Sequence, residues 1–202
     1  AAQAEKPAAR LASMVKVADR AIVRIGEIVN LIHMYARDGY PTTPGDVQFD
    51  ALAARTIDTA LAVPEGATLS VDLQCPGAAV AGVADELMQV IRTLVQNALD
   101  AVASTPGGRV NVHSFRDKRS YVFVVDDNGV GIPRDVLPRI FTPFFSTKAS
   151  TDGMGLGLAI AHQVVTAARG AIRVTSEPGA GTRFEVRLPI SKLDGEEGSL
   201  ND

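Results

Sequence analysis

Four short stretches of the sequence combine polar side chains with glycines in patterns that could do chemistry. The first, residues 94–101, lies within a segment whose apolar spacing predicts a helix. Asn97 and Asp100 are three residues apart, so they share one face of that helix. The amide oxygen of Asn97 is a hard ligand that suits Mg²⁺ when anionic oxygens complete the coordination. Taken alone, this stretch is explained equally well as a polar surface face.

The second stretch, residues 126–133, follows an apolar segment that predicts a strand. A carboxylate at the end of a strand can accept a hydrogen bond from an amine, while Gly129 and Gly131 let a ligand approach the backbone. A calcium loop counted from Asp126 is excluded, because Leu137 stands where such a loop needs its final glutamate.

The third and fourth stretches follow closely along the chain. Residues 141–148 crowd three phenylalanines beside Lys148, which either reaches a phosphate as a point charge or is simply solvated on a hydrophobic loop. Residues 153–158 carry glycine at every second position into a predicted helix, whose first N–H groups and dipole attract anions. This spacing is neither the dinucleotide-binding fingerprint nor a P-loop.

A mixed set of helices and strands must position these stretches. The apolar spacing predicts three helices, at residues 50–63, 85–103 and 156–168. Asp50 is the expected N-cap of the first helix. Strands are predicted at residues 47–49, 68–73, 109–115, 121–125, 171–176 and 182–188. We therefore expect an α+β fold, a two-layer α/β sandwich with a mixed, largely antiparallel sheet of about five strands and three helices on one face.

A long helix is predicted ahead of this domain. Within residues 11–37, apolar residues recur at alternating steps of four and three, a period of about 3.5 that is typical of a helical bundle. A core helix packed on its own domain would leave a similar pattern. Two prolines and two glycines within residues 39–45 then predict a hinge. The expected organisation is a bundle helix with its hinge over residues 1–46, an α/β domain over 47–190 and a disordered acidic tail over 191–202.

The composition excludes several classes of function. A net charge of −3 without any long run of Lys and Arg argues against nucleic acid binding. No apolar run approaches ~18 residues, so no membrane contact is expected from this segment. The single cysteine, Cys75, cannot form an internal disulfide, which favours a cytoplasmic location, with a parent protein that can still be membrane-anchored.

Taken in order, the four stretches and residues 179–182 resemble the motifs of one family. They are similar to the N, first-glycine, F, second-glycine and last glycine-containing motifs of the ATP-binding domain of two-component sensor histidine kinases, over about residues 47–189. That family shares its α/β sandwich, the Bergerat fold, with the DNA gyrase and heat-shock chaperone ATPases. The helix of residues 11–37 resembles the second helix of the family's dimerisation and histidine-phosphotransfer bundle.

The resemblance assigns roles residue by residue. It implies that Asn97 is the metal ligand, binding Mg²⁺ and positioning the phosphates. Asp127 is similar to the Asp that bonds the adenine amino group, with Thr182 supporting it through water. Gly129 and Gly131 would let the nucleotide approach. The lid and the phosphate-wrapping segment supply the other ATP-binding positions, which are Lys148, Gly153, Gly155, Leu156, Gly157 and Leu158. Of these, Lys148 is also a candidate catalytic residue.

Two positions depart from the family pattern. The related ATPases have a Glu four residues before the magnesium-binding Asn, where it acts as base for water attack. Here that position is Thr93, so hydrolysis is disfavoured and transfer to a protein nucleophile is favoured. Many kinases of the family have Asn at the same position, where its side-chain amide makes a second contact to the phosphates. The resemblance does not assign that contact to Thr93. Asp100 replaces a residue that is basic in numerous members, which weakens the case for a phosphate contact from it.

None of the three histidines fits the family's phosphoacceptor, which lies on the first bundle helix and is followed by an acidic residue. His33 is followed by Met34, and His113 and His162 fall in a predicted strand and a predicted helix, where they are structural. The chain starts at Ala1 without Met, so we expect the first bundle helix to have been cut away.

The resemblance thus implies an ATP- and Mg²⁺-dependent protein histidine kinase that forms a homodimer through its bundle. It would transfer the γ-phosphoryl group of ATP to a bundle histidine outside this chain, and from there the group would pass to the receiver domain of a response regulator. Two alternatives stay open. One is a nucleotide-binding pseudokinase or scaffold that acts through bundle contacts, and the other is a serine kinase of the anti-sigma-factor type.

Overall fold

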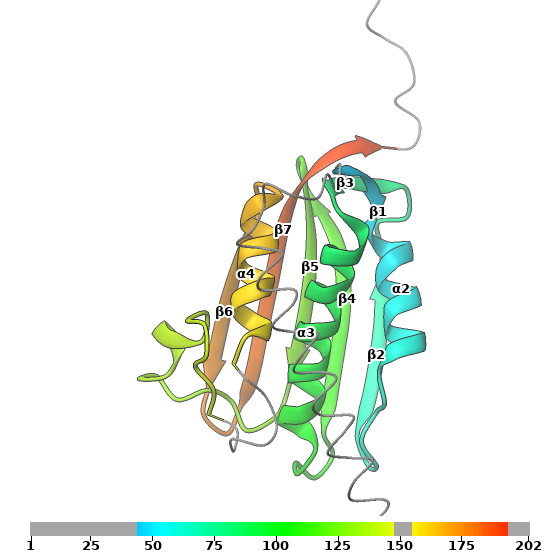
Figure 1. The fold of residues 1–202 in the computed structure, drawn as a ribbon. Coiled ribbons are helices and arrows are strands. Elements are labelled where there is room, and N and C mark those ends of the chain that lie inside the picture. Colours follow the sequence, from blue (N-terminus) through cyan, green and yellow to red (C-terminus); the bar gives the residue numbers. More distant parts are fainter. Residues whose placement is uncertain (1–43, 148–154, 194–202) are drawn as a thin grey trace, which may run out of the picture.

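The computed structural model describes residues 44–147 and 155–193, and this part of the chain forms two layers (Figure 1). The helices on one face of the sheet are α2 (Phe49–Ala60), α3 (Ala84–Val102) and α4 (Gly157–Ala167), and a short 3-10 helix, η1, spans Leu137–Arg139. The strands are β1 (Gly45–Gln48), β2 (Thr68–Leu73), β3 (Ala78–Gly82), β4 (Arg109–Asp117), β5 (Ser120–Asp127), β6 (Ala171–Glu177) and β7 (Gly181–Leu193). The expected α+β sandwich is confirmed, although the sheet has seven strands instead of about five.

The last strand, β7, lies in the interior of the sheet. The strand order is β1-β3-β7-β5-β4-β2, and β6 pairs with β7 as well. Residues 182–189 pair with β5, whereas residues 190–193 of β7 pair with β3, and a register shift between Ala79 and Val80 interrupts that second pairing. All strand pairs are antiparallel except β2 with β4. β7 is therefore the strand that joins the two parts of the sheet.

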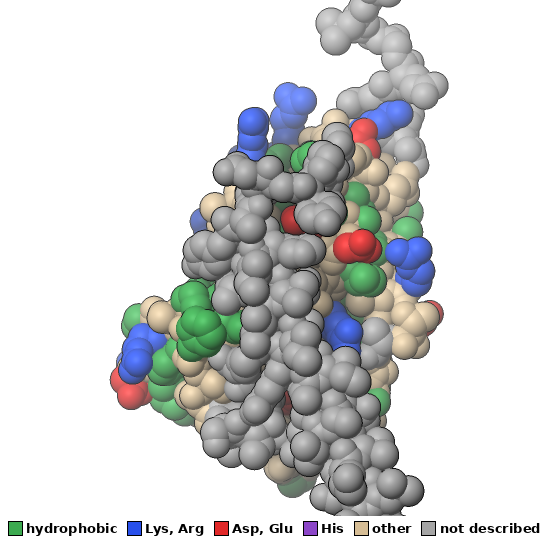
Figure 2. All heavy atoms as spheres, viewed as in Figure 1, with side chains coloured by type: hydrophobic (Ala, Val, Ile, Leu, Met, Phe, Trp, Pro, Cys, Tyr) green, Lys and Arg blue, Asp and Glu red, His purple; other side chains and the backbone are tan. Residues whose placement is uncertain are grey.

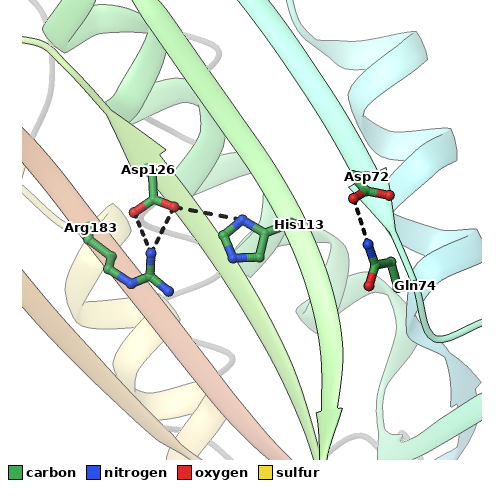
Figure 3. Close-up of polar contacts among 5 residues, drawn as sticks. All are labelled: Asp72, Gln74, His113, Asp126 and Arg183. Atoms are coloured by element: carbon green, nitrogen blue, oxygen red, sulfur yellow. Dashed lines mark hydrogen bonds and ion pairs between the residues drawn. The ribbon is translucent and has the colours of Figure 1, made fainter.

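The central strands turn alternate side chains toward the helices, as the pleat requires. The helix-facing residues of β4, β5 and β7 share one hydrophobic core with α3 and are at most 4% exposed: Val110, Val112, Tyr121, Phe123, Val125, Phe184, Val186 and Leu188. The opposite face carries polar and charged side chains, several of them paired (Figure 3). The position of a residue along β5 therefore decides whether its side chain faces the helices. None of the helices in residues 44–147 and 155–193 has the length and apolar character needed to cross a bilayer.

Strand β3 was not predicted, and it changes the boundary of the domain. Its sequence is short and consists of small residues, which carry no clear strand signal. Its pairing with β7 places Ala78 opposite Leu193, so residues 191–193 belong to the sheet and their prediction as part of a disordered tail is wrong. The sheet also begins at Gly45, inside the predicted hinge. The predicted bundle helix and residues 194–202 lie outside the described residues.

Asp50 is not the N-cap of α2. Helix α2 begins at Phe49, Gln48 holds the N-cap position, and Asp50 turns into the interior with 8% of its surface exposed. Its carboxylate accepts hydrogen bonds from the backbone N–H of Cys75 at 2.6 Å and from the hydroxyl of Ser114 at 2.7 Å. The hydroxyl of Tyr121 donates to the same carboxylate oxygen as Ser114, and burial together with this contact raises the pKa of Tyr121. One carboxylate thus ties α2 to β4, to β5 and to the turn that follows β2.

We expect Asp50→Ala to lower the free energy of unfolding by about 3 kcal/mol, because three buried donors lose their acceptor. Urea unfolding followed by circular dichroism measures the loss. Asp58→Ala removes an exposed carboxylate from the same helix and should change stability by less than about 0.5 kcal/mol. Equal stability of the two variants would show that the buried carboxylate adds nothing to the fold.

Candidate functional site

Helix α3 carries a line of residues that touches both glycine-rich segments. Thr93, Asn97 and Ala101 are four residues apart, so they follow one side of the helix. At one end of the line, a Cβ on Gly157 would come within 3.1 Å of the Thr93 side chain. At the other end, the N–H of Val130 donates to the Ala101 carbonyl at 3.2 Å. Asn97, which is half-buried, therefore lies between the start of α4 and the loop after β5.

The two aspartates at the end of β5 face opposite sides of the sheet. Asp126 lies on the outer face, where Arg183 donates to both of its carboxylate oxygens at 2.9 and 3.0 Å. The Nδ1 atom of His113 is 3.7 Å from the same carboxylate (Figure 3). Because these groups are partly exposed, the ion pair stabilises the fold by at most about 1 kcal/mol. Asp126 is thus held on the outer face, and only Asp127 is directed toward the helices.

Asp127 is an acceptor at the edge of the interior. Its carboxylate is half-buried and accepts a hydrogen bond from the backbone N–H of Gly129 at 2.8 Å. Burial raises the pKa of Asp127, hydrogen bonds from the backbone of Gly129 and Thr182 oppose that rise, and the nearby Asp126 charge adds to it. Thr182 is paired with Asp127 across the β5–β7 ladder and is 6% exposed. The two side chains therefore form one polar corner beneath the helices.

The glycines after β5 and at the start of β7 are required by the protein's own backbone. Gly131 has a φ of +67°, and a Cβ at this position would collide with the carbonyl oxygen of Glu177. Gly181 has a φ of +109°, and a Cβ there would collide with the carbonyl oxygen of Asp127. A Cβ on Gly129 would meet the Ala101 carbonyl in the same way. The predicted reason for Gly129 and Gly131 was the close approach of a ligand. The close packing of β5, β6 and α3 is a second reason for glycine at these positions.

The segment with the three phenylalanines packs against the backbone that leads into α4. Gly155 has a φ of +68°, and a Cβ there would collide with the carbonyl oxygen of Phe145. The guanidinium of Arg139 lies over the ring of Phe145 at 4.3 Å. Phe144 is 67% exposed, so it does not anchor the segment. Figure 2 shows hydrophobic side chains (green) at the surface on the side of the domain where the segment between β5 and α4 projects in Figure 1.

The other predicted site residues are placed as follows. Gly157 is the first residue of α4, Leu156 before it is fully buried in the core, and Leu158 packs partly buried against that core. Lys148 and Gly153 lie outside the described residues, as does His33. His162 is exposed on α4, with its ring 5.0 Å from the ring of Phe141.

The donor set of this region suits a hard cation that arrives with its own anionic oxygens. Among residues 44–147 and 155–193, no group of three or more His, Cys, Asp or Glu side chains could hold a metal ion. The amide oxygen of Asn97 is a neutral hard ligand, which matches Mg²⁺ bound chiefly to phosphates and water. The residues present are therefore compatible with Mg²⁺ carried by a nucleotide.

One polar residue of the site was not predicted from the sequence. Ser176, near the end of β6, pairs with Thr182 across the β6–β7 ladder and lies 2.9 Å from its hydroxyl. Its own hydroxyl also accepts a hydrogen bond from the backbone N–H of Ile132 at 2.8 Å. A serine three residues before Gly179 has no distinctive spacing, so its role emerges only from the register of the sheet.

Comparison with known proteins gives a consistent result. The family model described as histidine kinase-, DNA gyrase B- and HSP90-like ATPase matches residues 82–192. The C4-dicarboxylate transport sensor protein DctB of Rhizobium meliloti (strain 1021) is 35% identical over 169 residues, which cover 82% of this chain and 26% of that protein. The two-component sensor PprA of Pseudomonas aeruginosa is 38% identical over 131 residues, or 60% of this chain and 14% of that protein. The chain thus spans only a minor part of these curated relatives.

Solved structures show the same fold. The mycobacterial sensor histidine kinase MprB is 29% identical, with a TM-score of 0.64, and the match covers 75% of this chain and all of that one. Full-length ShkA, solved in complex with AMPPNP, superposes with a TM-score of 0.77 at 20% identity, over 96% of this chain and 41% of that one. The second likeness concerns the fold alone.

Proposed function

Because the chain belongs to the family of histidine kinase-, DNA gyrase B- and HSP90-like ATPases and represents the catalytic domain of a two-component sensor kinase, we propose that it binds Mg²⁺·ATP and passes the γ-phosphoryl group to a histidine. The observation that carries the proposal is the place of Asn97 on α3, between the glycine-rich loop after β5 and the start of α4. A nucleotide that reaches from one segment to the other has to pass this side chain.

The proposal gives each end of the site a task. The Asp127 carboxylate accepts a hydrogen bond from the adenine amino group, and Thr182 supports this contact. Gly155 and Gly157 lead into α4, whose first backbone N–H groups and dipole favour the phosphates. Lys148 and Gly153 complete the lid over the phosphates in this proposal.

The chain's own residues mainly bind and orient the reactants. Asn97 is the residue that would hold Mg²⁺, which neutralises charge on the phosphates when it is bound. Asn97 would thereby hold the phosphates in an orientation that exposes the γ-phosphoryl group to an incoming nucleophile. Leu156, buried below the start of α4, keeps this end of the site on the rigid core.

Transfer to a protein group is favoured over hydrolysis at this site. Thr93, which packs against Gly157, occupies the position at which the related ATPases have a glutamate. A threonine hydroxyl is too weak a base to activate water. The proposed acceptor is a histidine on the dimerisation bundle of a homodimer, outside this chain. The receiver domain of a response regulator is the proposed final recipient.

We expect saturating AMPPNP with Mg²⁺ to raise the melting temperature of the 202-residue chain by roughly 5–10 °C, because a ligand at 100 times its Kd stabilises a protein by about 2.7 kcal/mol. Differential scanning fluorimetry measures the shift, and AMP serves as the matched ligand without the outer phosphates. An unchanged melting temperature at saturation would refute nucleotide binding.

A second experiment distinguishes a kinase from a nucleotide-binding scaffold. Incubation with radiolabelled ATP and a supplied histidine-bearing bundle helix should label that helix. Binding of nucleotide without any transfer would instead favour the pseudokinase or scaffold function.

A further inference from the structure

Three polar side chains form a row across neighbouring strands at the end of the sheet. Asp127 on β5 is paired with Thr182 on β7, and Thr182 is paired with Ser176 on β6. Side chains paired in this way stand on the same face of a sheet and interact directly. This row lies on the helix-facing side, where Val125 and Phe184 enter the core.

The hydroxyl of Ser176 is in contact with three partners. Its oxygen lies 2.8 Å from the backbone N of Ile132, 2.9 Å from the carbonyl oxygen of Gly181 and 2.9 Å from the Thr182 hydroxyl oxygen. A hydroxyl has one proton to donate and two lone pairs that accept. The N–H of Ile132 can only donate and the carbonyl of Gly181 can only accept. The Ser176 proton is therefore committed to Gly181.

This commitment fixes the direction of the bond between the two hydroxyls. If Ser176 donated to Thr182, its lone pairs would face the lone pairs of the Gly181 carbonyl at 2.9 Å, which is repulsive. All three contacts are hydrogen bonds only when the Thr182 hydroxyl donates to Ser176. The rest of the Thr182 oxygen then offers lone pairs, so toward the site Thr182 accepts hydrogen bonds and does not donate them.

We propose that Ser176 is a positioning residue for base selectivity: by holding Thr182 as an acceptor beside the Asp127 carboxylate, it makes this corner favour a 6-aminopurine over a 6-oxopurine. The inference rests on the proposed nucleotide site. A 6-amino group, or a water that donates, satisfies two neighbouring acceptors, whereas a 6-oxo group directs its own lone pairs at them. Sites built from fixed hydrogen-bonding groups reject the mismatched analogue strongly, because buried polar groups then lose their partners.

The test compares the affinities of ATP and ITP, which differ at position 6 of the purine. Isothermal titration calorimetry on the 202-residue chain gives the ratio of the two dissociation constants. Ser176→Ala frees the Thr182 hydroxyl to rotate and donate to the 6-oxo group, so the preference for ATP should fall roughly three- to tenfold, the value of about one hydrogen bond. Ser176→Thr keeps a hydroxyl and should retain the preference.

Further variants make the test independent of simple destabilisation. Thr182→Val removes the oriented hydroxyl but keeps the hydrogen bond that Ser176 accepts from Ile132 and the one that it donates to Gly181, and it should lower the preference by a similar factor. Adding Ser176→Ala to it should change the ratio no further. Thr175→Ala, an exposed neighbour on the same strand, should leave the ratio unchanged.

The outcomes separate this inference from the proposed function. If Ser176→Ala, or Thr182→Val in case the first variant does not fold, weakens ATP and ITP equally, Ser176 is only structural and the inference is overturned. If the unaltered chain binds neither nucleotide, the proposed function itself fails.

Discussion

Asp127→Asn is expected to weaken ATP binding by roughly a hundredfold while leaving the nucleotide-free domain at least as stable. The carboxylate presents only acceptors to an amino group, whereas an asparagine also brings an N–H₂ group that opposes it, and loss of a hydrogen bond to a charged group costs about 1.5–3 kcal/mol. Calorimetry on the variant measures the first effect. Asp126→Asn alters the neighbouring carboxylate on the outer face and should retain ATP affinity.

The stability part of this prediction follows from the pKa of Asp127. Burial raises that pKa in the folded chain above the value in the unfolded chain, so the folded state binds the proton more tightly. Stability therefore rises as the pH falls through the raised pKa, and at neutral pH the ionised carboxylate costs stability. Asparagine removes that cost. The advantage in melting temperature of the variant over the unaltered chain should accordingly shrink as the pH falls through the raised pKa of Asp127.

The same titration should appear in binding. Affinity for ATP should fall as the pH drops through the raised pKa of Asp127, because the protonated group no longer offers a full acceptor pair. A variant that loses stability and keeps its ATP affinity would contradict both halves of the prediction.

Asn97→Ala is expected to reduce autophosphorylation of the full-length parent by at least about a hundredfold. The alanine cannot offer an oxygen to Mg²⁺, so the nucleotide loses its metal-dependent hold between the two glycine-rich segments. Affinity for the nucleotide should then respond little to Mg²⁺, which calorimetry with and without the ion will show.

A neighbour on the same helix provides the control for this variant. The side chain of Gln96 donates to Asp100 at 2.7 Å and lies off the line of Thr93, Asn97 and Ala101. Gln96→Ala should therefore keep both phosphorylation and the response to Mg²⁺. Near-normal phosphorylation by Asn97→Ala would refute the assignment of the metal to this residue.

The fold was predictable where local pattern and tertiary structure agree. Helix α3 has buried residues at steps of three and four, and its bounds were predicted to within one residue. Strand β2 was predicted over the whole of its length, because alternation is strong there and turn residues follow it. The family resemblance was likewise readable, since its motifs are short, local and ordered along the chain.

Features that depend on contacts distant in sequence were missed. Asp50 has a good N-cap side chain, but Ser114 and Tyr121 bind it in the interior, and nothing near Asp50 in the sequence signals them. Strand β3 exists because β1 and β7 pair with it on either side. Ser176 acquires its role from the register that brings it beside Thr182.

The place of β7 inside the sheet has a consequence for how the protein is made. Among the described strands, β6 pairs only with β7, and the β1–β3 pair is linked to β5–β4–β2 only through β7. The joining strand β7 leaves the ribosome after all the other described strands. The two parts of the sheet therefore cannot pair into one sheet until nearly the whole described chain has emerged. A nascent chain arrested before residue 181 would hold unjoined strands with open edges, which are the surfaces that chaperones shield and that seed aggregation.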